Sequence, residues 1–179
     1  SWTSWTAPGS TSREVFVGPF GLLAYLTDDL RRSPYDKHLQ MQYATTYMIW
    51  IEGVLALSVM KITLSYARDF KVLPSYYTGF TATCRDEARH VQAGMRFVRQ
   101  LLDEDPAYVK DLHETLRTLL TMGAARSSLI DYVPLGWSEE RAEALFLDQL
   151  GKKLAMVGVS LPPDLVEMVK MVKPTAAGG

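Results

Sequence analysis

The stretch TATCRDEARHVQAG (residues 81–94) places a glutamate and a histidine, Glu87 and His90, three residues apart. No proline interrupts residues 75–102 around it, which predicts a helix that Ser75 caps and that ends near Leu102. Residues three apart lie on one face of a helix, so Glu87 and His90 offer an oxygen and a nitrogen ligand side by side. Such a pair is common by chance, and alone it also fits two polar residues on a solvated face.

A second helix is predicted for residues 36–69, which contain no proline and a single glycine, Gly53. Glu52 lies near its middle, and the residues that share its face are apolar: Met48, Ile49, Leu55, Ala56 and Val59. A carboxylate in apolar surroundings is costly to desolvate without a partner. That partner is either a metal ion or an arginine or backbone donor.

These two helices form a predicted antiparallel hairpin that brings the acids to one level. At a rise of 1.5 Å per residue, the helix of residues 36–69 extends about 22 Å from Glu52 to Ala67. The helix of residues 75–102 runs in the opposite direction and extends roughly 18–22 Å from Ser75 to Glu87 and His90. Glu52 is therefore expected to face Glu87 and His90. A carboxylate opposite a Glu-x-x-His pair on the neighbouring helix is half of a di-iron carboxylate site.

The remaining sequence also predicts helices, and no segment alternates with the period of a strand, so the expected fold is all-α. Further helices are expected for residues 13–32, 105–132 and 139–150, with a short one after Pro163. We expect residues 1–12 to be a flexible leader, 13–172 one helical domain and 173–179 a disordered tail.

The segments IEGVLALSVMKI (51–62) and LPSYYTGFTATCRDEARHVQAGMRFVRQLL (73–102) carry a family resemblance. They resemble the second half of the ferritin-like di-iron carboxylate superfamily, in its ribonucleotide-reductase-small-subunit-like branch of reductase subunits, ligand-binding oxidases and monooxygenase hydroxylases. The resemblance covers about residues 36–105. It implies a ferritin-like helical bundle, of which this chain would be the C-terminal half.

The resemblance also implies roles for individual residues. Glu52 and Glu87 would be the carboxylate ligands on which catalysis depends, and His90 would be the nitrogen ligand of one iron. Asp86 corresponds to an acid behind the ligands that orients a histidine from the other half of the site. The implied cofactor is two iron ions per completed site, with manganese allowed at one position.

Helical spacing predicts which side chains line a substrate pocket beside the metals: Thr45, Met48, Ala56, Phe80, Thr83 and Cys84. Ala56 is small where reductase subunits tend to carry an aromatic residue, which leaves room for a substrate. The ending PTAAGG also lacks the aromatic and acidic tail by which reductase subunits dock their large subunit. Both features favour an oxidase or oxygenase.

The other half of such a site, a further carboxylate and a further Glu-x-x-His, is missing from the sequence. Because the chain does not begin with methionine, the first explanation is a longer protein whose N-terminal half is a separate or cleaved chain. The second is a homodimer in which two copies complete the site. The third is a relative that binds no metal pair.

Composition excludes some classes of partner. A net charge of −1 argues against nucleic-acid binding, which needs a basic surface. The longest apolar run, MIWIEGVLALSVM, is short for a membrane span and contains Glu52, so no membrane association is expected. The single cysteine, Cys84, excludes an internal disulfide and is typical of a cytoplasmic protein.

The function predicted from the sequence is a non-haem di-iron oxidase or oxygenase that activates O2 and oxidises a small organic substrate, served by an electron-donor protein. One alternative is a radical-generating subunit of the reductase type. The other is a non-catalytic helical scaffold that partners an active homologue.

Overall fold

The computed structural model describes residues 11–124 and 132–171. Among these residues every regular element is helical and none is a strand, which confirms the all-α expectation. The elements are α1 (Thr11–Arg32), α2 (Lys37–Ala44), the π-helix η2 (Thr45–Ala56), α3 (Leu57–Asp69), α4 (Pro74–Glu104), the 3₁₀ turn η3 (Pro106–Tyr108), α5 (Val109–Ala124), the 3₁₀ turn η5 (Val133–Leu135), α6 (Glu139–Val157) and α7 (Pro163–Met171).

Local signals explain most helix ends. The Ser138 side chain accepts a hydrogen bond from the Arg141 backbone N–H at the start of α6. Gly158, with φ of 74°, ends α6 in the left-handed conformation that glycine adopts without strain. The predicted cap at Ser75 is wrong, because α4 already begins at Pro74, whose fixed φ suits the first turn of a helix.

Several predicted boundaries differ from the structure. The helix expected at 139–150 continues to Val157, because Gly151 has open space around it and apolar residues follow it. The helix expected at 105–132 begins with the short turn η3 and is described only to Ala124, since residues 125–131 lie outside the described part. α1 begins at Thr11, inside the predicted leader; residues 1–10 and the predicted tail lie outside the described residues.

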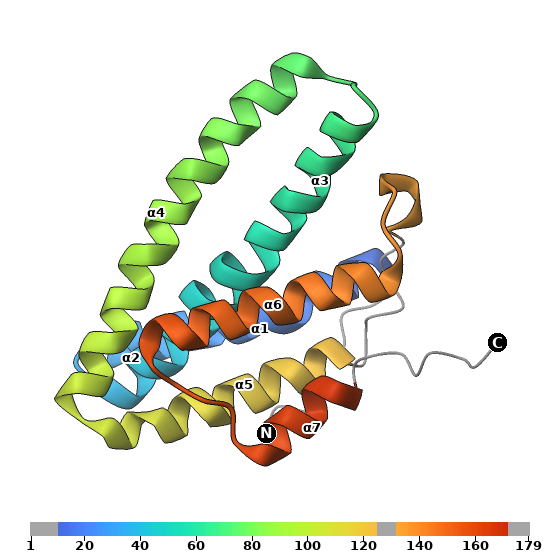
Figure 1. Cartoon of the computed structure of the whole chain (residues 1–179). Helices are drawn as coiled ribbons and strands as arrows, with labels where there is room; N and C mark the ends of the chain where they lie inside the picture. The colour runs from blue at the N-terminus through green and yellow to red at the C-terminus, as the bar shows by residue number, and fades with distance from the viewer. Residues whose placement is uncertain (1–10, 125–131, 172–179) are drawn as a thin grey trace.

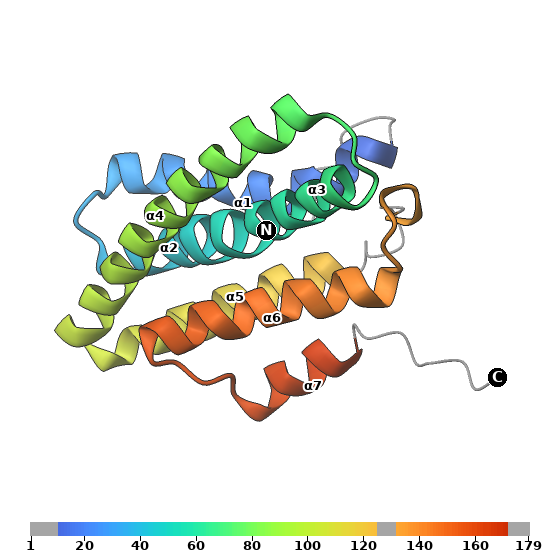
Figure 2. The ribbon, with the colours of Figure 1, turned by 45° about the horizontal axis from the view of Figure 1, so that its top comes forward.

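The continuous helix of α2, η2 and α3 is the centre of the fold. Its π-helical part contacts α1, α4, α5 and α6. Figure 1 shows α3 and α4 extending together as a hairpin away from α5, α6 and α7. In Figure 2, α5, α6 and α7 lie below the central helix, so this helix is covered near η2 and more open towards the hairpin tip.

Burial follows the same division. The core gathers around η2 and includes fully buried side chains from four helices: Met41, Ile49, Val98, Leu112 and Leu116. A smaller cluster joins α3 to α6 through Ile62, Trp137, Ala142 and Leu145, and the Trp137 indole donates a hydrogen bond of 2.7 Å to Ser65 Oγ. Large apolar side chains near the hairpin tip are exposed: Phe70, Leu73, Tyr76 and Tyr77.

Within the described residues, one helix, Lys37–Asp69, is long and apolar enough to cross a membrane by length and composition alone. Its most apolar window has a mean hydropathy of 1.5, and 44% of that window is buried inside the protein. A buried core helix passes the same test, so the finding is weak evidence. The absence of membrane association stays a prediction.

Candidate metal centre

Three residues that the sequence singled out meet between two helices. Glu52 comes from η2, and Glu87 and His90 come from α4. One ligand atom of each lies within 4.8 Å of the other two. Glu52 and Glu87 are half-buried, whereas His90 is exposed, so the cluster opens to solvent on the histidine side.

The π-helix around Glu52 is a feature that the sequence analysis missed. It spans twelve residues, Thr45–Ala56, and π-helical turns are frequently found at functional sites. A Cβ atom added at Gly53 would lie 2.9 Å from the Met48 carbonyl oxygen and 3.1 Å from Lys153 Cε. Only glycine fits beside Glu52 in this packing, and Gly53 was the one sequence signal of the unusual turn.

A second glycine sets the distance between the two helices. A Cβ atom added at Gly94 would lie 2.7 Å from Met48 Cβ, closer than real Cβ atoms approach. Gly94 follows His90 by one helical turn. The missing side chain therefore lets α4 press against η2 beside the cluster, which brings His90 and Glu87 within reach of Glu52.

The two carboxyl groups are electrostatically coupled. Hydrogen bonding to Glu52, followed by burial and by the charge of Glu52, raises the pKa of Glu87 to about 7, while His90 opposes the shift. Two carboxylates this close repel each other, so the pair retains a proton at a pH at which an isolated glutamate is ionised. The Glu87 carboxyl group therefore keeps its proton to a higher pH than an isolated glutamate does.

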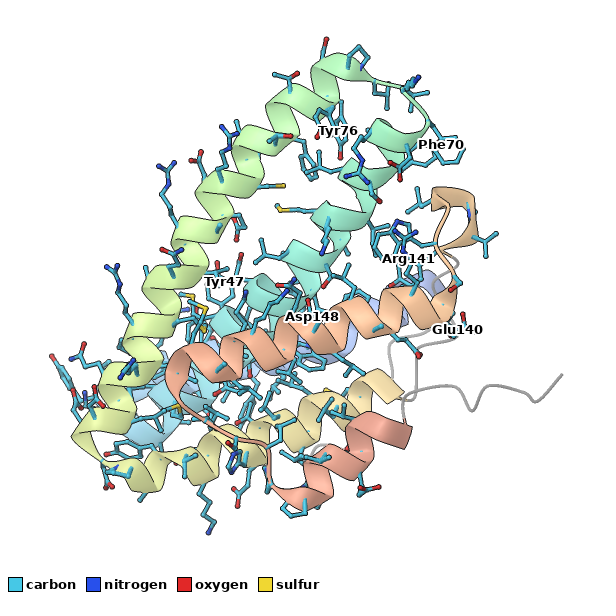
Figure 3. The ribbon with its side chains drawn as sticks, in the orientation of Figure 1. Tyr47, Phe70, Tyr76, Glu140, Arg141 and Asp148 are labelled. Carbon is cyan, nitrogen blue, oxygen red and sulfur yellow. The ribbon has the colours of Figure 1, made fainter. Side chains whose placement is uncertain are left out.

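Tyr47 belongs to the same polar group. Its hydrogen bond to Glu52, together with burial, raises the pKa of Tyr47 to about 12. Figure 3 shows Tyr47 between α4 and the central helix. The Tyr43 ring packs against it with centroids 5.8 Å apart. Tyr47 thus holds its proton and orients the Glu52 carboxylate.

The cluster has donor atoms for a metal ion, and no lysine or arginine of the described residues forms an ion pair with its acids. Within the described part of the chain, neither Glu52 nor Glu87 forms an ion pair, so the arginine partner considered for Glu52 is not found there. Glu87 Oε1 is buried without a hydrogen-bond partner. Two carboxylate oxygens and an imidazole nitrogen suit first-row divalent metals, and such an ion would offset the repulsion between the acids.

The other predicted site residues lie in different surroundings. Asp86 is exposed and pairs with Arg89 on the surface of α4, so its expected role towards a histidine of the other half stays a prediction. Thr83 was expected on the inward face but is exposed, and its hydroxyl donates to the Gly79 carbonyl at 3.4 Å. The reason is that Thr83 lies one turn nearer the open hairpin tip than Glu87.

The remaining predicted pocket residues are less exposed. Thr45 is fully buried, Met48 and Ala56 are half-buried, and Phe80 stacks on Tyr76 with ring centroids 4.9 Å apart. Cys84 is half-buried and lines a groove beside the cluster.

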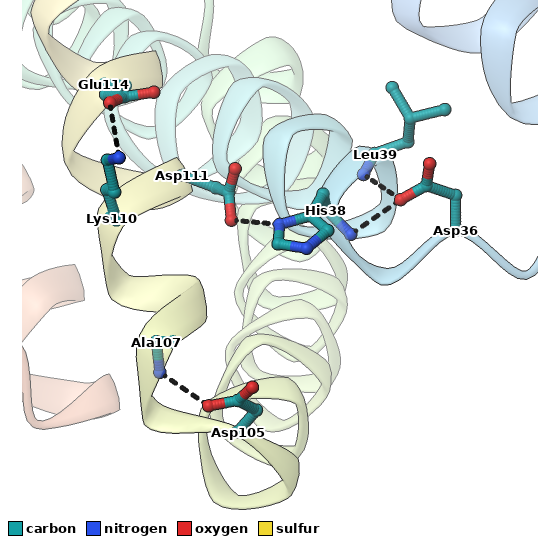
Figure 4. A network of polar contacts seen from close by, with 8 residues as sticks. All are labelled: Asp36, His38, Leu39, Asp105, Ala107, Lys110, Asp111 and Glu114. Atoms are coloured by element: carbon teal, nitrogen blue, oxygen red, sulfur yellow. Dashed lines mark hydrogen bonds and ion pairs between the residues drawn. The ribbon is translucent and has the colours of Figure 1, made fainter.

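A second polar cluster joins α2 to α5. His38 Nδ1 lies 2.8 Å from Asp111 Oδ2, and Figure 4 shows this pair beside the Asp36 cap of α2. Lys37 pairs with Glu104 at 2.9 Å nearby. The hydrogen bond to Asp111 raises the pKa of His38 above its usual value. Each acid of the two pairs here has a basic partner, so the cluster is a structural tie between helices.

Comparison of the chain with known proteins found no matching family model, no matching curated protein and no matching solved structure. The chemistry of the Glu52–Glu87–His90 cluster therefore rests on its own residues.

Proposed function

We propose that this chain supplies half of a dinuclear carboxylate centre in a ferritin-like bundle, and that the completed protein is a non-haem di-iron oxidase or oxygenase. The observation that carries the proposal is the convergence of Glu52, Glu87 and His90 within 4.8 Å, where neither acid pairs with a lysine or arginine of the described residues. A buried, unpartnered Glu87 oxygen supports it, because proteins seldom leave such an atom unsatisfied.

The residues have distinct tasks in this proposal. Glu52 and Glu87 hold the metal through oxygen, and His90 holds one ion through nitrogen. Iron, or iron with manganese, bound there would supply the activation of O2 and the oxidation of a small organic substrate. Glu87 must first release its proton, so metal uptake and proton release are linked. Tyr47 keeps Glu52 oriented through its hydrogen bond.

The proposal requires a partner for the other ligands, since a dinuclear site of this kind takes a further carboxylate and a further Glu-x-x-His pair. We favour a separate chain or a preceding segment of a longer protein, and a second copy of this chain is the next choice. The exposure of His90 and of residues 82–83 and 85–86 supports this requirement, because a partner could reach the metal from that side.

The decisive experiment is native mass spectrometry of the purified protein after expression with ample iron, followed by anaerobic Fe(II) titration and O2 exposure. We expect about two irons per completed site and O2 consumption that depends on Fe(II). A metal-free species that neither takes up Fe(II) nor consumes O2 would overturn the oxygenase proposal and favour a scaffold. The spectrum also reports whether the other half is a different polypeptide or a second copy.

A further inference from the structure

A groove of about 330 Å³ runs along α3 beside the metal cluster, closed by residues of α4, α6 and the segment before α6. Its α3 wall includes Leu57, Met60, Leu64 and Arg68, which recur at the helical period and share one face, and Lys61 and Ser65 line it between them. From Leu57 to Arg68 this wall extends about 16 Å at 1.5 Å per residue. The groove is therefore long and narrow, with apolar side chains along most of its length.

One end of the groove approaches the metal ligands. Cys84 lines it and precedes Glu87 by one helical turn. Burial and the nearby charge of Glu87 raise the pKa of the Cys84 thiol, so this cysteine is a neutral, weakly polar part of the wall. A ligand that reached Leu57 and Cys84 would place its apolar end next to Glu87.

The other end is cationic. Arg68 of α3 and Arg141 of α6 line it beside Trp137, and Figure 3 shows Arg141 on the side of α6 that faces α3. The Arg141 guanidinium lies 3.8 Å from the centroid of the Trp137 ring, and this cation–π contact fixes its position.

The positive charge of the groove is incompletely balanced. Arg68 pairs with Asp69 at 2.8 Å, but among the described residues neither Arg141 nor Lys61, which lines the groove further in, forms an ion pair. Three basic side chains thus lie near a single acid, Asp69. Arg68 and Arg141 both lower the pKa of Asp69. A cationic end on an apolar groove attracts an anion that carries an apolar body.

We propose that this groove binds an amphiphilic organic anion, with its anionic head at Arg68 and Arg141 and its apolar body along Leu57, Met60 and Leu64 towards Cys84. The apolar end then lies next to the metal cluster, which makes this molecule the substrate of the oxidation. That last step rests on the proposed function, whereas binding itself does not. A carboxylate and a phosphate monoester share the required chemistry.

Isothermal titration of the metal-free full chain tests the proposal with probes that share a ten-carbon tail: decanoate, decyl phosphate, decanol and decyltrimethylammonium, each below its micelle concentration. We expect at least one anion to bind about ten-fold more tightly than decanol, because a charge-assisted contact adds to the same apolar burial. The stronger of the two anions identifies the head group. Equal affinity for anions, alcohol and cation, or no binding, would overturn the proposal.

Variants locate the binding site. The double variant Arg68→Gln/Arg141→Gln should lose about ten-fold in affinity for the anion and keep its affinity for decanol. Arg99→Gln removes an exposed cation outside the groove. It should change neither the affinity for the anion nor the affinity for decanol. An equal loss in Arg99→Gln would overturn the assignment to this groove. If the double variant misfolds, Arg68→Gln alone and the wild-type probe series test the same assignment.

Because these titrations contain no metal, they separate the two proposals. Anion-selective binding in a protein that takes up no Fe(II) would support the groove and contradict the oxygenase. Iron uptake by a protein without anion-selective binding would support the proposed metal site and contradict the proposed ligand of the groove.

Discussion

The two clusters that contain a histidine and acids differ in how their charges are balanced. At α2, His38 pairs with Asp111 of α5 and Lys37 pairs with Glu104 at the end of α4, so each of these two acids has a basic partner at 2.8–2.9 Å. Between η2 and α4, Glu52 and Glu87 lie close together beside His90, neither acid forms an ion pair with another described residue, and a buried Glu87 oxygen has no hydrogen bond.

Residue types alone therefore do not mark a ligand site. Both clusters offer carboxylate and imidazole, but the first already satisfies its groups within the protein. The second retains a proton on Glu87 at near-neutral pH, which an added cation would displace. The difference teaches that the proposed metal-binding role rests on unbalanced charge and an unpartnered buried atom, and not on residue types.

The largest expected difference is between two single variants, each of which removes the histidine of one cluster. His90→Ala should lower the affinity for Fe(II), or for Co(II) as an air-stable probe, by more than about 100-fold, because loss of an outer-shell partner alone costs about 10–100-fold. His38→Ala should leave metal affinity unchanged, since its imidazole already pairs with Asp111. Equal metal affinity in both variants, measured by titration, would show that His90 is no ligand.

The next largest effect concerns the contact between Gly94 and Met48, which brings α4 close to η2 beside Glu52, Glu87 and His90. Gly94→Ala should destabilise the protein by about 1–3 kcal/mol, because its Cβ atom meets Met48 at 2.7 Å and forces α4 away from η2. Metal affinity should fall as well, since the ligands of α4 move away from Glu52. Urea denaturation and Co(II) titration measure the two effects.

The matched control for Gly94 lies in the same helix. Gly79 has no atom within 4 Å of an added Cβ atom, so Gly79→Ala should stabilise the protein by about 0.4–1 kcal/mol and leave metal affinity unchanged. If Gly94→Ala behaved like Gly79→Ala, the close contact with Met48 would not position the cluster.

A smaller effect concerns the proton of Glu87. The pKa of Glu87 rises from 4.5 unfolded to about 7 folded, so the metal-free fold binds this proton more tightly than the unfolded chain does. Its contribution to stability is complete below pH 4.5 and is lost as the pH rises through 7. Glu87→Gln cannot ionise and can still hydrogen-bond to Glu52.

The metal-free Glu87→Gln protein should therefore be more thermostable than the wild type at pH 8, with the difference shrinking towards pH 5. Melting curves by circular dichroism at both pH values check this. Glu114→Gln, which removes an exposed acid paired only with Lys110, should show no such gain. An unchanged melting temperature at pH 8 would indicate that the two carboxyl groups are not coupled.

The smallest effect is expected in the balanced cluster. The hydrogen bond to Asp111 raises the pKa of His38 above 6.5, so the stability it contributes is complete below pH 6.5 and is lost as the pH rises through the folded pKa. His38→Gln should thus lower the melting temperature slightly at pH 5.5 and less at pH 9. The effect is small because the His38 side chain is largely exposed.

Much of the fold and the core of the candidate site could be predicted from local patterns. The absence of strand alternation indicated an all-α protein, and the Ser138 cap marked the start of α6. Counting residues along the hairpin placed Glu52 level with Glu87 and His90, because helical rise per residue is constant and the connecting turn is short.

Contacts between distant segments could not be predicted in this way. The π-helical form of residues 45–56, the contact of Gly94 with Met48 and the exposure of Thr83 depend on how the helices pack. The groove likewise joins Arg68 to Arg141, which lie 73 residues apart in the chain.

The sequence by itself therefore determined which residues are helical and which acids and histidine share a level, because both follow from short-range geometry. Only the tertiary structure decided which of the two histidine clusters is balanced by partner charges. The reason is that electrostatic balance depends on side chains from separate helices, and packing alone decides which of them meet.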